Sequence, residues 1–148
     1  MRTFNLRVYG IIINPNNEVL VSDERRRGVS MTKFPGGGLN WGEGHKETLV
    51  REIKEEMDLN AEIGAFVYVN DFFESSAFQQ NDQLFSFYYQ VSKIDFDAIP
   101  ISNHTFPLTE EGEKFRWVSI SELTEEMFTF PIDKKVGSLL FQLLNLKF

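Results

Sequence analysis

The segment of residues 35–59 constrains the fold of this chain most strongly, because its apolar residues repeat with the period of a helix. Three glycines precede the repeat at positions 36–38, and strand-like alternation flanks the segment on both sides. Apolar residues three and four positions apart line one side of a helix. The residues of this apolar seam are Leu49, Val50, Ile53 and Met57. The pattern therefore predicts an amphipathic helix that packs this seam against the core.

The same helix carries a second face made of acidic residues. Since an α-helix turns by about 100° per residue, Glu52, Glu55 and Glu56 share one sector of its surface. Like charges at these spacings repel, so the helix itself gains no stability from them. Mg²⁺ and Mn²⁺ prefer carboxylate oxygen, and Mg²⁺ is commonly held by carboxylates together with the phosphates of a substrate. The pattern thus indicates either a metal–phosphate site beside a glycine-rich loop or an ordinary solvated acidic face.

Strand-like patterns occupy most of the remaining chain. Residues 4–22 predict a β-hairpin around the turn at Asn14–Asn17, and residues 23–33 predict a polar, basic loop. Further strands are predicted at residues 61–73, 84–94 and 114–118, with polar loops at 74–83 and 95–110.

Two more helices are predicted near the C-terminus. Ser119 and Glu122 fit a capping box that opens a short helix. An apolar stripe at helical spacing predicts a terminal helix, and its residues are Val136, Leu139, Leu140, Leu143 and Leu144. Strands interrupted by one central and one terminal helix predict an α/β sandwich with a mixed sheet.

The composition excludes several function classes. The chain has 148 residues, a formal net charge of −7 and no cysteine. A disulfide framework, a thiolate nucleophile and a cysteine-based metal site are therefore excluded. The acidity argues against a general nucleic-acid binder, which usually carries a basic stripe. We expect one cytoplasmic domain over residues 1–148, with no membrane segment and no room for a DNA-binding domain.

The segment that holds the predicted helix resembles the Nudix box, G-x5-E-x7-R-E-U-x-E-E-x-G-U, in which U is a bulky aliphatic residue. Eight positions match in register, namely Gly37, Glu43, Arg51, Glu52, Ile53, Glu55, Glu56 and Leu59. Asp58 replaces the last glycine, and we expect it to end the helix in the left-handed conformation with no loss of chemistry. Asn40 stands where many relatives carry another glutamate, so whether this position contributes to metal binding or substrate positioning in this chain is left open.

The resemblance implies a Nudix hydrolase with an α/β/α sandwich and a mixed β-sheet. Such enzymes cleave a phosphoanhydride of a nucleoside diphosphate linked to another moiety, with Mg²⁺ or Mn²⁺ and a water that attacks phosphorus. By analogy Glu52, Glu55 and Glu56 are the catalytic metal ligands. Glu43 and Arg51 support the site by holding loop and helix together.

The resemblance also implies functional residues outside the box. Glu111-Gly112, six residues before Trp117, is similar to MutT-like members, in which this glutamate binds metal or acts as the base. Its neighbours Glu110 and Glu113 are rival candidates for the same role.

Phosphate contacts are assigned to Arg25, Arg27, Gly37 and Gly38, with a merely solvated basic loop as the alternative for the arginines. Nothing outside the box specifies the substrate. A non-catalytic nucleotide-binding regulatory module is the alternative function. Members of the family are often dimers, so the resemblance also implies a possible homodimer.

Overall fold

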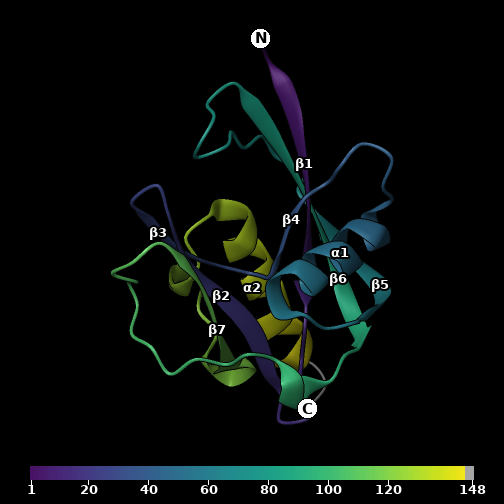
Figure 1. Cartoon of the computed structure of the whole chain (residues 1–148), viewed down its shortest axis with the longest axis vertical. Coiled ribbons are helices and arrows are strands. Elements are labelled where there is room, and N and C mark those ends of the chain that lie inside the picture. The colour runs from purple at the N-terminus through teal and green to yellow at the C-terminus, as the bar shows by residue number, and fades with distance from the viewer. Residues whose placement is uncertain (146–148) are drawn as a thin grey trace. The chain divides into compact units, whose positions relative to one another are not determined.

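The computed structural model describes residues 1–145 and divides into two compact units (Figure 1). The first unit consists of Met1–Ile12 and Pro35–Ala98. The second unit consists of Ile13–Phe34 and the chain from Ile99 onward. Each unit has its own sheet and its own long helix.

The first unit contains a four-stranded mixed sheet in the order β4-β1-β6-β5. Its strands are β1 (Thr3–Ile11), β4 (Gly36–Gly38), β5 (Glu62–Val69) and β6 (Asp82–Lys93). Strand β1 runs parallel to β6, whereas the β1–β4 and β5–β6 pairs are antiparallel. The mixed sheet predicted from the sequence is thereby confirmed.

Helix α1 (His45–Met57) packs on the sheet of the first unit. Leu49 and Ile53 are fully buried, but Val50 is 37% exposed, so the predicted seam is narrower than the sequence pattern indicated. Gly10 of β1 lies in a tightly packed place, since an added Cβ would lie 3.2 Å from a methyl group of Val91 and 3.4 Å from one of Leu49. Helix α1 therefore packs closely over this position of the strand.

The C-terminus of α1 confirms the expectation for Asp58. Its φ and ψ are 55° and 39°, which is the left-handed conformation that closes many helices. Its N–H donates to the carbonyl of Lys54 at 3.0 Å, and its carboxylate lies 2.9 Å from the Lys54 Nζ. The aspartate thus ends the helix in the left-handed conformation.

The second unit contains a three-stranded antiparallel sheet in the order β3-β2-β7. Its strands are β2 (Glu18–Arg26), β3 (Val29–Lys33) and β7 (Gly112–Ser119), and its long helix is α2 (Pro131–Asn145). The rings of Phe34 and Phe128 stack with centroids 4.7 Å apart. Gly137 of α2 lies directly against Phe128, because an added Cβ there would come within 2.6 Å of the ring.

Helix α2 confirms the predicted terminal helix. Val136 is fully buried and Leu140 is 5% exposed, as expected for the apolar stripe. The side chains of Leu143 and Leu144, which continue the stripe, lie outside the described part of the chain.

Two strand predictions are wrong. Residues 23–33 are not a loop, because β2 and β3 form a hairpin whose turn is made by Arg27 and Gly28. Both turn residues have positive φ, 52° and 77°, which suits a tight hairpin between charged strand ends. Residues 4–22 are not a hairpin, since β1 and β2 belong to different sheets. At the turn, Ile13 and Val19 form an isolated bridge, and the N–H of Asn14 donates to the Glu18 carbonyl at 3.0 Å.

The predicted capping box is also absent. Residues Ile120–Glu122 form a single 3-10 turn, and Ser119 makes no capping hydrogen bond to it. Its hydroxyl instead lies 2.9 Å from that of Ser121. The N–H of Ile120, at the start of the turn, donates to the Asn17 carbonyl at 3.0 Å.

Candidate functional site

The three acidic residues of α1 lie beside the glycine strand of the first unit. A Cβ added at Gly37 would lie 2.5 Å from the carboxyl carbon of Glu52, so only glycine leaves room for this carboxylate. The side chain of Glu52 is 15% exposed and that of Glu55 is 58% exposed. Glu56 is partly buried one position further along the helix. Strand β4 and helix α1 therefore form a cradle around a partly shielded group of carboxylates.

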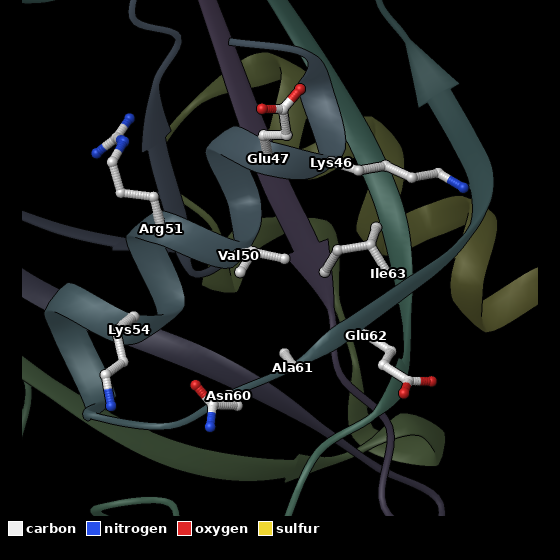
Figure 2. A pocket seen from close by; sticks show the side chains of 9 residues that line it. All are labelled: Lys46, Glu47, Val50, Arg51, Lys54, Asn60, Ala61, Glu62 and Ile63. Carbon is white, nitrogen blue, oxygen red and sulfur yellow. The ribbon is translucent and has the colours of Figure 1, made fainter.

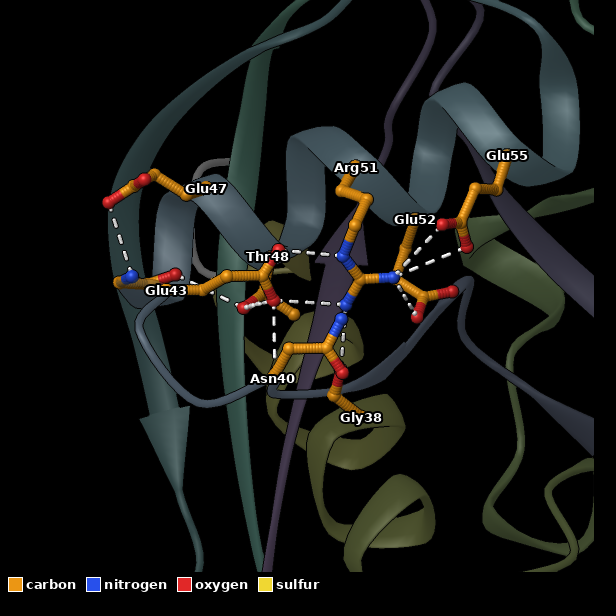
Figure 3. Close-up of polar contacts among 9 residues, drawn as sticks. Gly38, Asn40, Glu43, Glu47, Thr48, Arg51, Glu52 and Glu55 are labelled. Atoms are coloured by element: carbon orange, nitrogen blue, oxygen red, sulfur yellow. Dashed lines mark hydrogen bonds and ion pairs between the residues drawn. The ribbon is translucent and has the colours of Figure 1, made fainter.

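Arg51 and Glu43 connect the preceding loop to this helix (Figure 3). Two guanidinium nitrogens of Arg51 lie 2.7 and 3.1 Å from the two carboxylate oxygens of Glu43, and one donates to the carbonyl of Gly38 at 2.9 Å. Glu43 also accepts hydrogen bonds from the N–H of Asn40 and the hydroxyl of Thr48, both at 3.0 Å. Glu43 and Arg51 therefore join the loop before α1 to the helix and to β4.

The electrostatics of the pair follow from these contacts. The Arg51 hydrogen bonds lower the pKa of Glu43 to about 2, aided by those from Asn40 and Thr48 and opposed by desolvation. The hydrogen bonds with Glu43 raise the pKa of Arg51 most, and those with Glu52 and Glu55 raise it further, whereas desolvation opposes the rise. The loop and the helix are therefore joined by an ion pair that stays charged over the whole physiological range.

Arg51 also reaches two of the expected metal ligands. Its Nη1 lies 3.0 Å from Glu52 Oε1 and 3.2 Å from Glu55 Oε2 (Figure 3). Within residues 1–145, no three acidic or histidine side chains already converge as a closed metal site. The donor set is nevertheless made only of carboxylate oxygens beside a glycine cradle, which fits a hard divalent cation. Arg51 balances part of the negative charge of this set.

The acidic residues near β7 belong to the second unit. Glu111 is 59% exposed, and its carboxylate lies 3.5 Å from Arg25 Nε. Arg25 also donates to the carbonyl of Leu108 at 3.2 Å. Glu113, by contrast, accepts a hydrogen bond from Ser22 and lies 3.2 Å from the buried Nζ of Lys33.

The sequence-predicted residues therefore fall into two groups. The first unit brings together Gly37, Gly38, Glu43, Arg51, Glu52 and Glu55. The second unit brings together Arg25 and Glu111, with Arg27 at the tip of the β2–β3 hairpin. Of the acidic candidates around β7, Glu111 is the more accessible and Glu113 is held within the fold.

A separate cavity of about 600 Å³ lies between α1 and the start of β5 (Figure 2). Val50 faces Ile63 across it, and Lys46 and Lys54 contribute positive charge. Arg51 lines this cavity, whereas the described lining does not contain the carboxylates of Glu52, Glu55 or Glu56. The cavity is therefore distinct from the acidic face of the helix.

Sequence reasoning missed a buried polar cluster in the second unit. Asp23 is completely buried and accepts hydrogen bonds from the Thr32 hydroxyl at 2.7 Å and from Arg116 Nε at 2.7 Å. The ring nitrogen Nε2 of His104 lies 2.7 Å from the same carboxylate. The one available signal was an aspartate two residues after the apolar run Val19–Val21, and no local pattern links it to a histidine 81 residues away.

Comparison with known proteins covers nearly the whole chain. A family model described as NUDIX domain matches residues 3–138. A mouse protein named nucleoside diphosphate-linked moiety X motif 6 is 28% identical over 140 residues, and its Xenopus laevis counterpart is 29% identical over 143. The matched regions cover 93% of this chain but only 42% and 60% of those relatives, so the chain spans about half of their length.

Solved structures show the same fold. The Escherichia coli ORF135 protein matches 98% of this chain, and 92% of its own, with a TM-score of 0.69 at 19% identity. A MutT protein from Methanosarcina mazei Go1 matches 97% of this chain, and 96% of its own, with a TM-score of 0.69 at 20% identity. These likenesses confirm the predicted α/β fold with a mixed sheet. None of the helices in the described residues has the length and apolar character that crossing a membrane requires.

Proposed function

This chain belongs to the Nudix family, and we propose that it is a metal-dependent hydrolase that cleaves a phosphoanhydride bond of a nucleoside diphosphate derivative. The observation that carries the proposal is the glycine cradle of Gly37 around Glu52, with Glu55 and Glu56 on the same helix face. Loss of these carboxylates would have favoured a non-catalytic binding module, but all three are present.

Each residue of the cradle has a proposed role. Glu52, Glu55 and Glu56 hold Mg²⁺ or Mn²⁺, since these ions prefer carboxylate oxygen. When bound, such an ion neutralises phosphate charge and lowers the pKa of a coordinated water. Arg51 orients Glu52 and Glu55 through its hydrogen bonds, and Glu43 fixes Arg51.

Residues of the second unit also have proposed roles. Glu111 is accessible, and we assign to it the role of general base or additional metal ligand. Gly37 and Gly38 offer backbone groups to the phosphates, and Arg25 and Arg27 offer positive charge. Because Arg25 is hydrogen-bonded to Leu108 and paired with Glu111, we expect it to act together with that glutamate.

The substrate class is proposed from the same family. The names of the mouse and frog relatives refer to nucleoside diphosphates linked to a further moiety, and we propose this class for the present chain. NTPs, nucleotide sugars and ADP-ribose belong to it. We propose a single Nudix domain over residues 1–148, located in the cytoplasm and able to form a homodimer.

A substrate panel tests the proposal. The full chain is incubated with Mg²⁺ or Mn²⁺ and with NTPs, dinucleotides, nucleotide sugars and ADP-ribose, and NMP release is measured. We expect release from at least one compound, with a loss of about a hundredfold or more in Glu56→Gln. The matched control is Glu126→Gln, which removes an exposed carboxylate of the second unit. Full activity of Glu56→Gln would contradict the assigned role, and no release from any compound would contradict the proposed reaction.

A further inference from the structure

A long connection in the second unit ends at Glu111. Residues 99–111, here called the 99–111 loop, contain no helix and no strand, and β7 begins directly afterwards at Gly112. Three polar contacts join this loop to β2. They are His104 to Asp23 at 2.7 Å, Arg25 to the Leu108 carbonyl at 3.2 Å and Arg25 to Glu111 at 3.5 Å.

The contact between His104 and Asp23 differs from the other two because it is buried. The side chain of His104 is 5% exposed and that of Asp23 is 0% exposed, whereas Arg25 and Glu111 are 34% and 59% exposed. Hydrogen bonds in such an environment are weakened less by water and salt. The histidine is therefore the firmest polar attachment of the loop to β2.

Asp23 is a fixed anion on the central strand of this sheet. Thr32 donates to it from β3 and Arg116 from β7. Burial alone would raise the pKa of Asp23, but the hydrogen bonds from Arg116, Thr32 and His104 outweigh burial and hold it below its ordinary value. His104 thus docks against a carboxylate that is charged and held in place by both neighbouring strands.

Both ring nitrogens of His104 face oxygen atoms. Nε2 lies 2.7 Å from Asp23 Oδ2, and Nδ1 lies 3.2 Å from the carbonyl oxygen of Ser102. A neutral imidazole has one N–H, whereas an imidazolium has two and satisfies both acceptors. One other charged group near the ring is Arg116, which also donates to Asp23. His104 lines a cavity of about 540 Å³, and the charged residues that line this cavity with it are Glu110, Glu111 and Lys114.

We propose that His104 is a positioning residue whose buried contact with Asp23 fixes the 99–111 loop and thereby the place of Glu111. Only the consequence for catalysis rests on the proposed function, because the attachment of the loop can be measured without any substrate.

The first experiment measures the loop itself in the full chain. Amide hydrogen exchange is recorded for the wild type, for His104→Ala and for His45→Gln, the control that changes the other histidine. In His104→Ala the amide of Ser102, which donates to the Phe115 carbonyl at 3.0 Å, should exchange roughly ten- to a hundredfold faster, as loss of one charge-assisted hydrogen bond predicts.

The second experiment measures catalysis with the substrate found in the panel. His104→Ala should lower kcat about tenfold with little change in KM, because a displaced acid slows chemistry more than binding. His104→Gln keeps an N–H donor for Asp23, so it should restore most of kcat.

The outcomes separate the parts of the proposal. Unchanged exchange in His104→Ala would overturn the attachment. Faster exchange with unchanged kcat would overturn the positioning role. A wild-type chain without hydrolase activity would contradict the proposed function, whereas the exchange experiment would still decide the attachment.

Discussion

Arg51 and Glu43 face each other with two N–H···O contacts, of 2.7 and 3.1 Å, between the guanidinium and the carboxylate. This paired geometry suits arginine and cannot be reproduced by lysine, whose ammonium group is a point charge. Because the same guanidinium also binds the Gly38 carbonyl, Glu52 and Glu55, one side chain connects loop, strand and acidic helix face. Changes at either partner should therefore affect both stability and metal binding.

Glu43→Gln tests the contribution of this pair to stability. The pKa of Glu43 in the folded chain is about 2, below its ordinary value of 4.5. A carboxyl group whose pKa is lowered in the folded chain stabilises the fold at pH values above its ordinary pKa of 4.5. This stabilisation is lost as the pH falls toward the pKa of about 2 that the group has in the folded chain. We expect Glu43→Gln to lower Tm at neutral pH and to lose less stability than the wild type between about pH 4.5 and about pH 2. Thermal melts at several pH values measure this, with Glu126→Gln as control, and parallel acid profiles would contradict the assignment.

Arg51→Lys tests the geometry rather than the charge. Lysine keeps one positive charge beside the carboxylates but lacks the planar guanidinium fork, whose N–H groups bind Glu43 and the Gly38 carbonyl at the same time. We expect a loss of about 1–3 kcal/mol in the free energy of unfolding, measured in urea, since buried carbonyl and carboxylate acceptors lose donors. Lys54→Arg is a matched exchange in the opposite direction on an exposed part of the same helix, and it should change stability little. Equal stability of Arg51→Lys and wild type would show that the fork is not needed.

Gly37→Ala tests the glycine cradle. Its Cβ would lie 2.5 Å from the Glu52 carboxyl carbon, at the end of a flexible side chain that can move aside. We therefore expect a folded protein with a small change in Tm but a weakened response to Mg²⁺. Gly38→Ala is the matched control for Mg²⁺ binding, because its Cβ would meet only the Arg7 side chain at 3.7 Å. Titration of both variants with Mg²⁺ by calorimetry measures the difference, and equal affinities would show that Glu52 does not need the cradle.

Local patterns in the sequence predicted the parts of the fold that depend on local periodicity. The helical spacing of Leu49 and Ile53 placed α1 and its acidic face correctly, and Asp58 closes the helix as expected. The pairing of β1 with β6 could not be predicted, since it depends on contacts between residues that are distant in the chain. The contact of Asp23 with His104 was missed for the same reason, because no repeat or motif joins residues 81 positions apart.

The charges of Arg25 to Arg27 misled the prediction in a different way. Polar residues indicated a loop, but a strand whose side chains alternate between two faces can carry charges wherever one face is solvated. Positive φ at Arg27 and Gly28 then closes the hairpin. Turn geometry, not polarity, therefore decides the structure of residues 23–33.

Addition of Mg²⁺ tests the acidic face as a whole. Between Glu43 and Glu62 the chain carries seven acidic and three basic residues, and Arg51 balances only part of this charge. A cation that binds the folded chain raises stability by mass action, by about 2.7 kcal/mol at 100 times its Kd, which corresponds to a rise of several degrees in Tm. We expect Mg²⁺ to raise Tm in the wild type and in Glu126→Gln, and the double variant Glu55→Gln, Glu56→Gln to lose most of this rise. Potassium chloride at the same ionic strength separates binding from screening. An equal rise in the wild type and the double variant would show that Glu55 and Glu56 do not bind the ion.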